Sequence, residues 1–141
     1  MLEFFRIWTG VLGALIALQF FLAGYGAIAT GDTAEAFELH IMNGRLIGAV
    51  SLLGILFAVL ARSGSKLVGL AAAVFGLVAL QSVIALVSVG GTVPGQILFG
   101  LHAVNAVFIM SVAGRADKTA KRLLEDRRIS AGDASPEAAT A

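Results

Sequence analysis

Four long apolar stretches, separated by short polar joins, dominate the chain. The stretches occupy residues 7–29, 39–61, 67–89 and 97–113. Each approaches or exceeds the roughly 20 apolar residues that a helix needs to cross the hydrocarbon layer of a bilayer. The joins are too short to hold a soluble domain. The pattern therefore predicts an all-α membrane protein, a four-transmembrane-helix bundle whose chemistry lies within the bundle or at its ends.

Composition supports a lipid environment and removes several kinds of chemistry. Hydrophobic residues make up 58% of the chain and charged residues 13%, which excludes an ordinary water-soluble domain of this size. The chain has no cysteine, so disulfides, thiolate ligands, covalently attached haem and iron–sulfur clusters are excluded. A signal peptide also begins with a positive residue and an apolar run, but the length of this run and the lack of a clear cleavage site predict a retained span.

Basic residues concentrate at one side of the predicted membrane. They precede the first span, lie between the second and third, and follow the fourth. These residues are Arg6, Arg62, Lys66, Arg115, Lys118, Lys121, Arg122, Arg127 and Arg128. The positive-inside rule then predicts cytoplasmic termini and outward loops at residues 30–38 and 90–96, in a membrane of the bacterial inner type. The formal net charge of +1 conceals this asymmetry and indicates no nucleic-acid partner.

Helix-start signals place two histidines at similar depths. Asp32 is a candidate N-cap with Glu35 in the first turn, and Pro94 suits the first turn of the last helix. From these starts His40 and His102 each lie about eight residues in, or about 12 Å along the helix. Both histidines are expected in the outer half of the bilayer.

The two halves of the chain repeat one another at an offset of 62 residues. Residues 14–23 align with residues 76–85. At the same offset the scarce polar residues pair: Gln19 with Gln81, His40 with His102, and Asn43 with Asn105. The repeat predicts two tandem helical hairpins related by a pseudo-two-fold axis along the membrane normal. Histidines that face this axis would form a symmetrical pair.

A histidine inside a membrane is costly unless its ring nitrogens find partners, which makes His40 and His102 candidate metal ligands. Two histidines are too few for Zn²⁺, which usually takes four ligands. A porphyrin supplies four nitrogens and leaves two axial positions. One bis-histidine haem b is therefore the cofactor that these residues fit best, although another metal or a purely structural hydrogen-bonding role remains an alternative.

Four amides accompany the histidines. The amides are Asn43, Asn105, Gln19 and Gln81, and they are candidates for cofactor binding because the second nitrogen of a metal-bound histidine donates a hydrogen bond and needs an acceptor. The alternative is that these amides join neighbouring helices.

Three residues near His40 complete the candidate site. Gly44 and Gly48 leave space for a flat group, although the same G-x-x-x-G spacing is typical of close helix packing. Arg45 is a candidate partner for a haem propionate, or it extends toward the outer surface.

The paired histidines and the H-x-x-x-G spacing of His40 and Gly44 resemble one four-helix half of heme A synthase. More loosely, they resemble small membrane b-type cytochromes. The resemblance implies haem between the second and fourth helices. Glu35 and Glu38 do not stand three residues before His40, where that family usually carries a catalytic carboxylate, so the resemblance extends to the haem site and not to the synthase activity.

These residues predict a membrane cytochrome that works in electron transfer or haem-linked redox chemistry. They favour this role over that of a stand-alone enzyme, and such a cytochrome would need a redox partner or quinone. The alternative is an accessory subunit of a larger membrane complex or homo-oligomer without its own cofactor. A transporter is disfavoured because no carboxylate lies at membrane depth.

One domain is expected over residues 1–129. Its last part, residues 115–128, is predicted to form an amphipathic cytoplasmic segment. Residues 130–141 are expected to be disordered because they carry nothing that builds a core.

Overall fold

The computed structural model describes residues 1–88 and 92–133, apart from the side chains of residues 33, 34 and 133. The described residues form helices and no strands. The helices are α1 (Leu2–Ala27), α2 (Thr33–Ala36), α3 (Glu38–Leu60), α4 (Ser65–Ser88) and α5 (Val93–Asp133). Of these, α1, α3, α4 and α5 are long and apolar enough to cross a membrane. The predicted multi-pass, all-helical architecture is confirmed.

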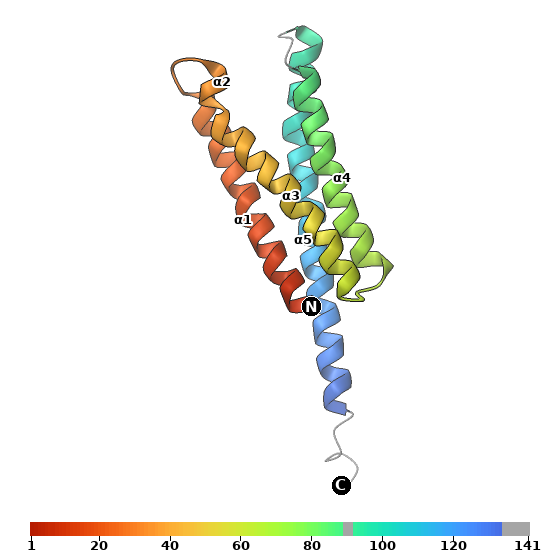
Figure 1. Ribbon diagram of the computed structural model, residues 1–141. Helices are drawn as coiled ribbons and strands as arrows, with labels where there is room; N and C mark the ends of the chain where they lie inside the picture. Colours follow the sequence, from red (N-terminus) through yellow and green to blue (C-terminus); the bar gives the residue numbers. More distant parts are fainter. Residues whose placement is uncertain (89–91, 134–141) are drawn as a thin grey trace.

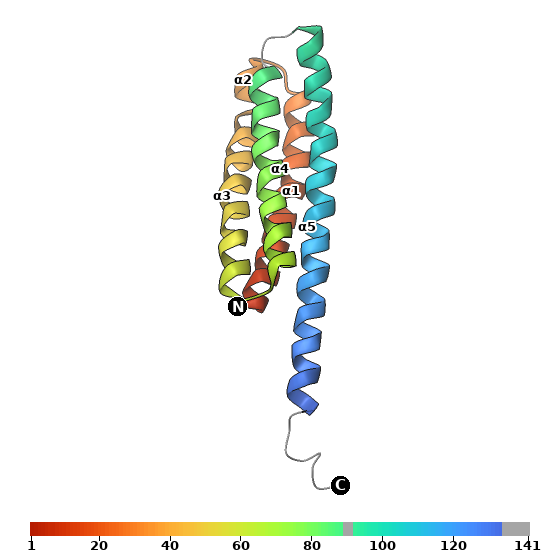
Figure 2. The same cartoon turned by 90° about the vertical axis from the view of Figure 1, so that its right-hand side faces the viewer.

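The four long helices form two antiparallel hairpins, α1 with α3 and α4 with α5 (Figure 1). Helix α3 packs on α1 and α4, and α5 packs on α4 and α1, so α3 and α5 are diagonal to one another. Figure 2, turned by 90°, shows α5 continuing well past the ends of the other helices. The beginning of α1 and the far part of α5 lie at the same end of the bundle, and the hairpins diverge toward the opposite end (Figure 1).

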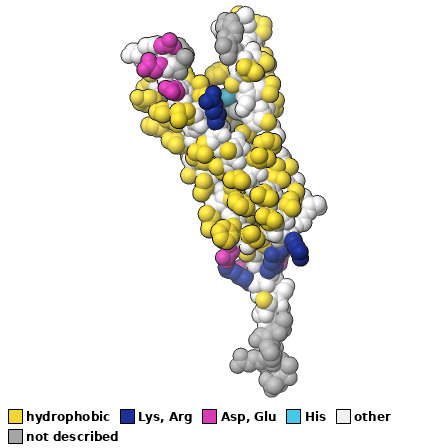
Figure 3. Space-filling model, in the orientation of Figure 1, with side chains coloured by type: hydrophobic (Ala, Val, Ile, Leu, Met, Phe, Trp, Pro, Cys, Tyr) yellow, Lys and Arg dark blue, Asp and Glu magenta, His cyan; other side chains and the backbone are white. Residues whose placement is uncertain are grey.

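The best-packed part of the core lies at the closed end of the bundle. Phe5, Leu12, Leu67 and Val74 are fully buried there and belong to one apolar cluster. Large apolar side chains cover much of the outer surface, and basic side chains gather below them (Figure 3). Since lipid tails are as apolar as leucine, an outward apolar surface costs nothing in a bilayer.

Trp8 joins α1 closely to α3. Its indole Nε1 donates a hydrogen bond to the carbonyl oxygen of Val50 at 2.6 Å. A Cβ atom at Gly54 would overlap the indole ring. Glycine is therefore required at position 54 for this approach of the two helices.

The helix starts follow the capping signals. Helix α2 begins at Thr33, directly after Asp32, but lasts only one turn before α3 begins at Glu38. At the other hairpin, the Gly95 amide donates to the Thr92 hydroxyl at 3.2 Å, and Pro94 occupies the first turn of α5 as predicted.

Helix α5 is longer than the predicted fourth span. It continues for 41 residues, which corresponds to about 60 Å. The predicted amphipathic segment is part of this helix, and its Ala116 and Ala120 are buried. Arg127 donates to the carbonyl oxygens of Ala61 and Arg62, both at 3.3 Å, so its charge lies at the C-terminal end of α3.

Helix α5 ends at Asp133, beyond the predicted domain boundary at residue 129. The helix runs four residues beyond residue 129, because no proline interrupts its backbone hydrogen bonds there. Residues 134–141 of the predicted tail lie outside the described residues.

Candidate ligand-binding site

A hydrogen-bond network joins the two helices of the first hairpin. The side-chain amide of Asn43 on α3 donates to the carbonyl oxygen of Leu15 at 2.9 Å and to Gln19 Oε1 at 2.7 Å, both on α1. Asn43 is 7% exposed. Its two amide protons therefore have acceptors, and the cost of burying the amide is offset.

Gln19 connects this network to His40. Gln19 Nε2 donates to the carbonyl oxygen of His40 at 3.0 Å and lies 3.0 Å from His40 Nε2. His40 Nδ1 lies 3.2 Å from the carbonyl oxygen of Gln19. A carbonyl only accepts and an amide N–H only donates, so the ring proton of neutral His40 belongs on Nδ1 and Nε2 carries the lone pair.

The same network recurs in the second hairpin, shifted by 62 residues. The Asn105 amide donates to the carbonyl oxygen of Leu77 at 2.8 Å and to Gln81 Oε1 at 2.6 Å. Gln81 Nε2 donates to the carbonyl oxygen of His102 at 2.8 Å. The structure thus brings together the glutamine, histidine and asparagine of each repeat, as interhelical contacts within each hairpin.

The two histidines approach one another across the bundle. Their ring centroids are 6.3 Å apart, with a 42° angle between the ring planes. Both side chains are half-buried. Among the described residues no group of three or more His, Cys, Asp and Glu side chains is placed to hold a metal ion. Among these side chains the pair therefore offers a metal ion two ligands, one from each hairpin.

The two histidines differ in their hydrogen bonds. His102 Nδ1 is buried and has no hydrogen-bond partner within residues 1–88 and 92–133. Both ring nitrogens of His40, in contrast, lie within hydrogen-bond distance of Gln19. The two networks are therefore alike in their amides and differ at the histidine rings.

An aromatic side chain accompanies each histidine, and the sequence analysis missed both. Phe37 meets His40 edge-on with a centroid distance of 5.9 Å, and Phe99 stacks on His102 at 5.2 Å and 12°. The phenylalanines are themselves 62 residues apart, so both halves carry F-x-L-H-x-x-N. Extending the repeat by three residues before each histidine finds them.

Comparison with known proteins yields a family for this chain. Residues 19–89 match the model of DUF6220, a family of unknown function. The chain belongs to the DUF6220 family. No curated protein and no solved structure matches it.

The DUF6220 match covers several of the polar residues of the site. It begins at Gln19, includes His40, Asn43 and Gln81, and ends before His102. The three polar side chains of the first network therefore lie in the DUF6220 segment, and Gln81 is the one polar side chain of the second network that does.

The remaining predicted site residues also lie in the DUF6220 segment. A Cβ atom at Gly44 would lie 3.3 Å from Gln19 Nε2, so this glycine gives the glutamine amide its space. A Cβ atom at Gly48 would meet nothing within 4 Å. Arg45 is exposed and forms no ion pair with the described residues. Figure 3 shows a basic side chain beside a histidine in the hollow between the diverging hairpins.

Proposed function

We propose that this chain is a membrane protein that binds one haem b, with His40 and His102 as the two axial ligands. The observation that carries the proposal is the approach of the two rings, which come from different hairpins and have centroids 6.3 Å apart. Two imidazole nitrogens on opposite sides of one metal lie about 4 Å apart, and their ring centroids about 6 Å apart, because each metal–nitrogen bond is about 2 Å long.

The surroundings of His40 also support ligation. A histidine that binds metal through one ring nitrogen generally donates its other N–H to a carbonyl or carboxylate. His40 Nδ1 lies 3.2 Å from the carbonyl oxygen of Gln19, which leaves Nε2 as the ligating atom. Ligation would exchange the contact between His40 Nε2 and the Gln19 amide for a metal bond, and that amide would keep its hydrogen bond to the His40 carbonyl oxygen.

The number of ligands favours haem over a protein-bound metal ion. Two histidines leave a Zn²⁺ ion two ligands short, but they complete the coordination of a porphyrin iron.

The other residues of the site would hold and orient the group. The two amide networks fix the backbone at each histidine, and Phe37 and Phe99 restrict the two rings. The open space at Gly48 admits a flat group, and Arg45 would pair with a propionate. Bound haem exchanges single electrons, so the protein would work in electron transfer or haem-linked redox chemistry with a redox partner or quinone.

The repeat supports a pseudo-two-fold arrangement of the hairpins about an axis along the membrane normal. Matching hydrogen bonds and matching buried positions occur 62 residues apart; the buried pairs include Phe5 with Leu67, Leu12 with Val74, and Ile47 with Ile109. We further propose that both termini are cytoplasmic in a membrane of the bacterial inner type. The histidine pair would then lie in the outer half of the bilayer.

An absorption spectrum of the purified protein, expressed with adequate haem and recorded oxidised and reduced, tests the function. We expect a Soret band and its red shift on reduction. His40→Ala and His102→Ala should each abolish or strongly alter both features, whereas Ser82→Ala, an exposed position in α4, should leave them unchanged. A colourless wild-type protein would assign the networks to helix packing, as in an accessory subunit. A band that persists unchanged in both histidine variants would overturn the axial assignment.

A further inference from the structure

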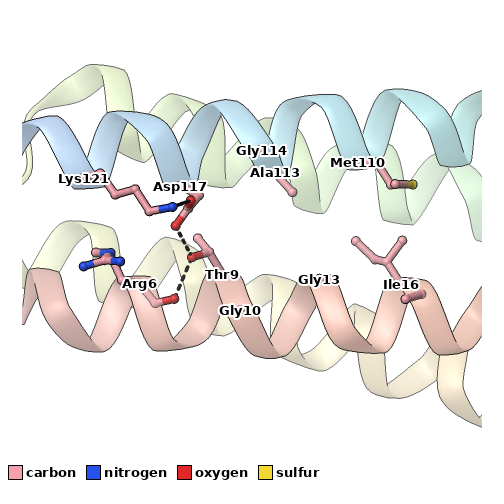
Figure 4. Close-up of a pocket in the computed structure, with 11 residues that line it drawn as sticks. Arg6, Thr9, Gly10, Gly13, Ile16, Met110, Ala113, Gly114, Asp117 and Lys121 are labelled. Atoms are coloured by element: carbon pink, nitrogen blue, oxygen red, sulfur yellow. Dashed lines mark hydrogen bonds and ion pairs between the residues drawn. The ribbon is translucent and has the colours of Figure 1, made fainter.

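A groove of about 470 Å³ lies between α1 and α5, away from the histidine pair (Figure 4). Its lining residues are Arg6, Thr9, Gly10, Gly13, Ile16, Ala17, Met110, Ala113, Gly114, Asp117 and Lys121. Met110 is the lining residue of α5 nearest His102, and about 12 Å of helix separates the two. On α1 the groove ends at Ala17, two residues before Gln19, so it runs from the basic end of the bundle to the edge of the first amide network.

One end of the groove is polar and charged. Lys121 Nζ pairs with Asp117 Oδ2 at 2.6 Å. The Thr9 hydroxyl lies 3.0 Å from Asp117 Oδ1 and 2.7 Å from the carbonyl oxygen of Arg6, so its proton is shared between two acceptors. The Lys121 ammonium offsets the charge of the Asp117 carboxylate, on which Arg6 also acts at longer range. The Arg6 guanidinium is exposed and forms no ion pair within the described part of the chain.

The rest of the groove is apolar and smooth. Gly10 and Gly13 on α1 face Gly114 on α5, and Ile16 and Met110 lie farther along (Figure 4). A Cβ atom at any of the three glycines would meet nothing within 4 Å. The three glycines are exposed, so this part of the groove opens toward the surrounding lipid.

We propose that this groove binds one anionic phospholipid, with its phosphate at Arg6 and an acyl chain along Gly10, Gly13 and Gly114. The groove passes from a charged end to an apolar end along α1 and α5, which is the polarity of a phospholipid from headgroup to chain.

The charge at the polar end selects the headgroup. Asp117 and Lys121 cancel one another, so Arg6 leaves a net charge of about +1 at the groove. An arginine fork donates to two phosphate oxygens at once. A zwitterionic phospholipid would bring a second positive charge to Arg6, whereas an anionic one would not. The other basic residues at this end of the bundle reinforce the preference.

Native mass spectrometry of the full chain, released from nanodiscs of equal parts phosphatidylglycerol and phosphatidylcholine, tests this proposal. The wild-type protein should retain one phosphatidylglycerol in at least several-fold excess over phosphatidylcholine. Gly13→Leu fills the groove from a position with free space and should abolish retention of that lipid. Arg6→Gln should remove the preference for phosphatidylglycerol.

Gly76→Leu is the matched control, because Gly76 is an exposed glycine on α4 with nothing within 4 Å of a Cβ atom and lies outside the groove. It should retain phosphatidylglycerol as the wild type does. Equal retention of the two lipids by the wild type, or undiminished phosphatidylglycerol in both Gly13→Leu and Arg6→Gln, would overturn the proposal. The readout does not depend on haem, so the two proposals fail or succeed separately.

Discussion

The rings of His40 and His102 have centroids 6.3 Å apart, although one histidine belongs to each hairpin. They lie on α3 and α5, which are diagonal to one another in the bundle. Each of these helices packs mainly on α1 and α4. Each histidine is instead positioned by its own hairpin, because Gln19 and Gln81 donate to the backbone carbonyl oxygens of His40 and His102 across the hairpins. The pair is therefore a product of how the hairpins pack.

The two amide networks have similar geometry and should contribute similarly to the free energy of unfolding. Asn43→Ala or Asn105→Ala removes two interhelical hydrogen bonds and takes the donor from the side-chain oxygen of Gln19 or Gln81. Because interhelical hydrogen bonds in membrane proteins average about 0.6 kcal/mol and reach about 1.7, each variant should lose about 1–3 kcal/mol. Unfolding by SDS in mixed micelles measures the loss.

Ser82→Ala serves as the comparison, since the Ser82 hydroxyl is exposed and bonds only within α4. It should change the free energy of unfolding by less than about 0.5 kcal/mol. If both asparagine variants behaved like Ser82→Ala, the networks would have no role in holding the hairpins together.

Gly54 should be far less tolerant of substitution than Gly48 in the same helix. A methyl group at position 54 overlaps the Trp8 indole, whereas one at position 48 meets nothing within 4 Å. Gly54→Ala should cost about 1–3 kcal/mol through overpacking, and Gly48→Ala should be neutral or stabilising by up to about 1 kcal/mol.

Fluorescence reports on the same substitution, because Trp8 is the single tryptophan of the chain. Gly54→Ala should shift its emission as the indole leaves its hydrogen bond to Val50. An unshifted spectrum together with unchanged stability would show that α1 and α3 do not pack as closely as described.

The proposed orientation is open to a direct test because the chain has no cysteine. Glu35 and Lys66 are exposed at opposite ends of the bundle. In intact cells a membrane-impermeant maleimide should label Glu35→Cys, and it should label Lys66→Cys only after permeabilisation. The reverse labelling pattern would place the histidine pair in the cytoplasmic half.

The sequence predicted the four long helices and the polar side chains of each network. Apolar stretches long enough for a bilayer predict spans without any tertiary information, because lipid leaves the backbone few other ways to satisfy its hydrogen bonds. The shared offset of Gln19, His40 and Asn43 with their counterparts identified residues that the structure joins. Phe37 and Phe99 obey the same offset but were missed, because aromatic residues are unremarkable in a membrane helix.

The contacts between helices depend on the tertiary structure and do not follow from the hydrophobic pattern of the sequence. The overlap that makes Gly54 obligatory, the contact of Arg127 with the end of α3, and the groove at Gly10 and Gly13 all depend on which helices pack together and at what angle. The hydrophobic pattern of a single helix does not predict these features. In lipid the outward faces of a span are as apolar as its packed face, so hydrophobicity alone does not show which face contacts another helix. By itself, the sequence determined four spans and a repeated polar set; the packing of the hairpins decided that two of those polar residues meet.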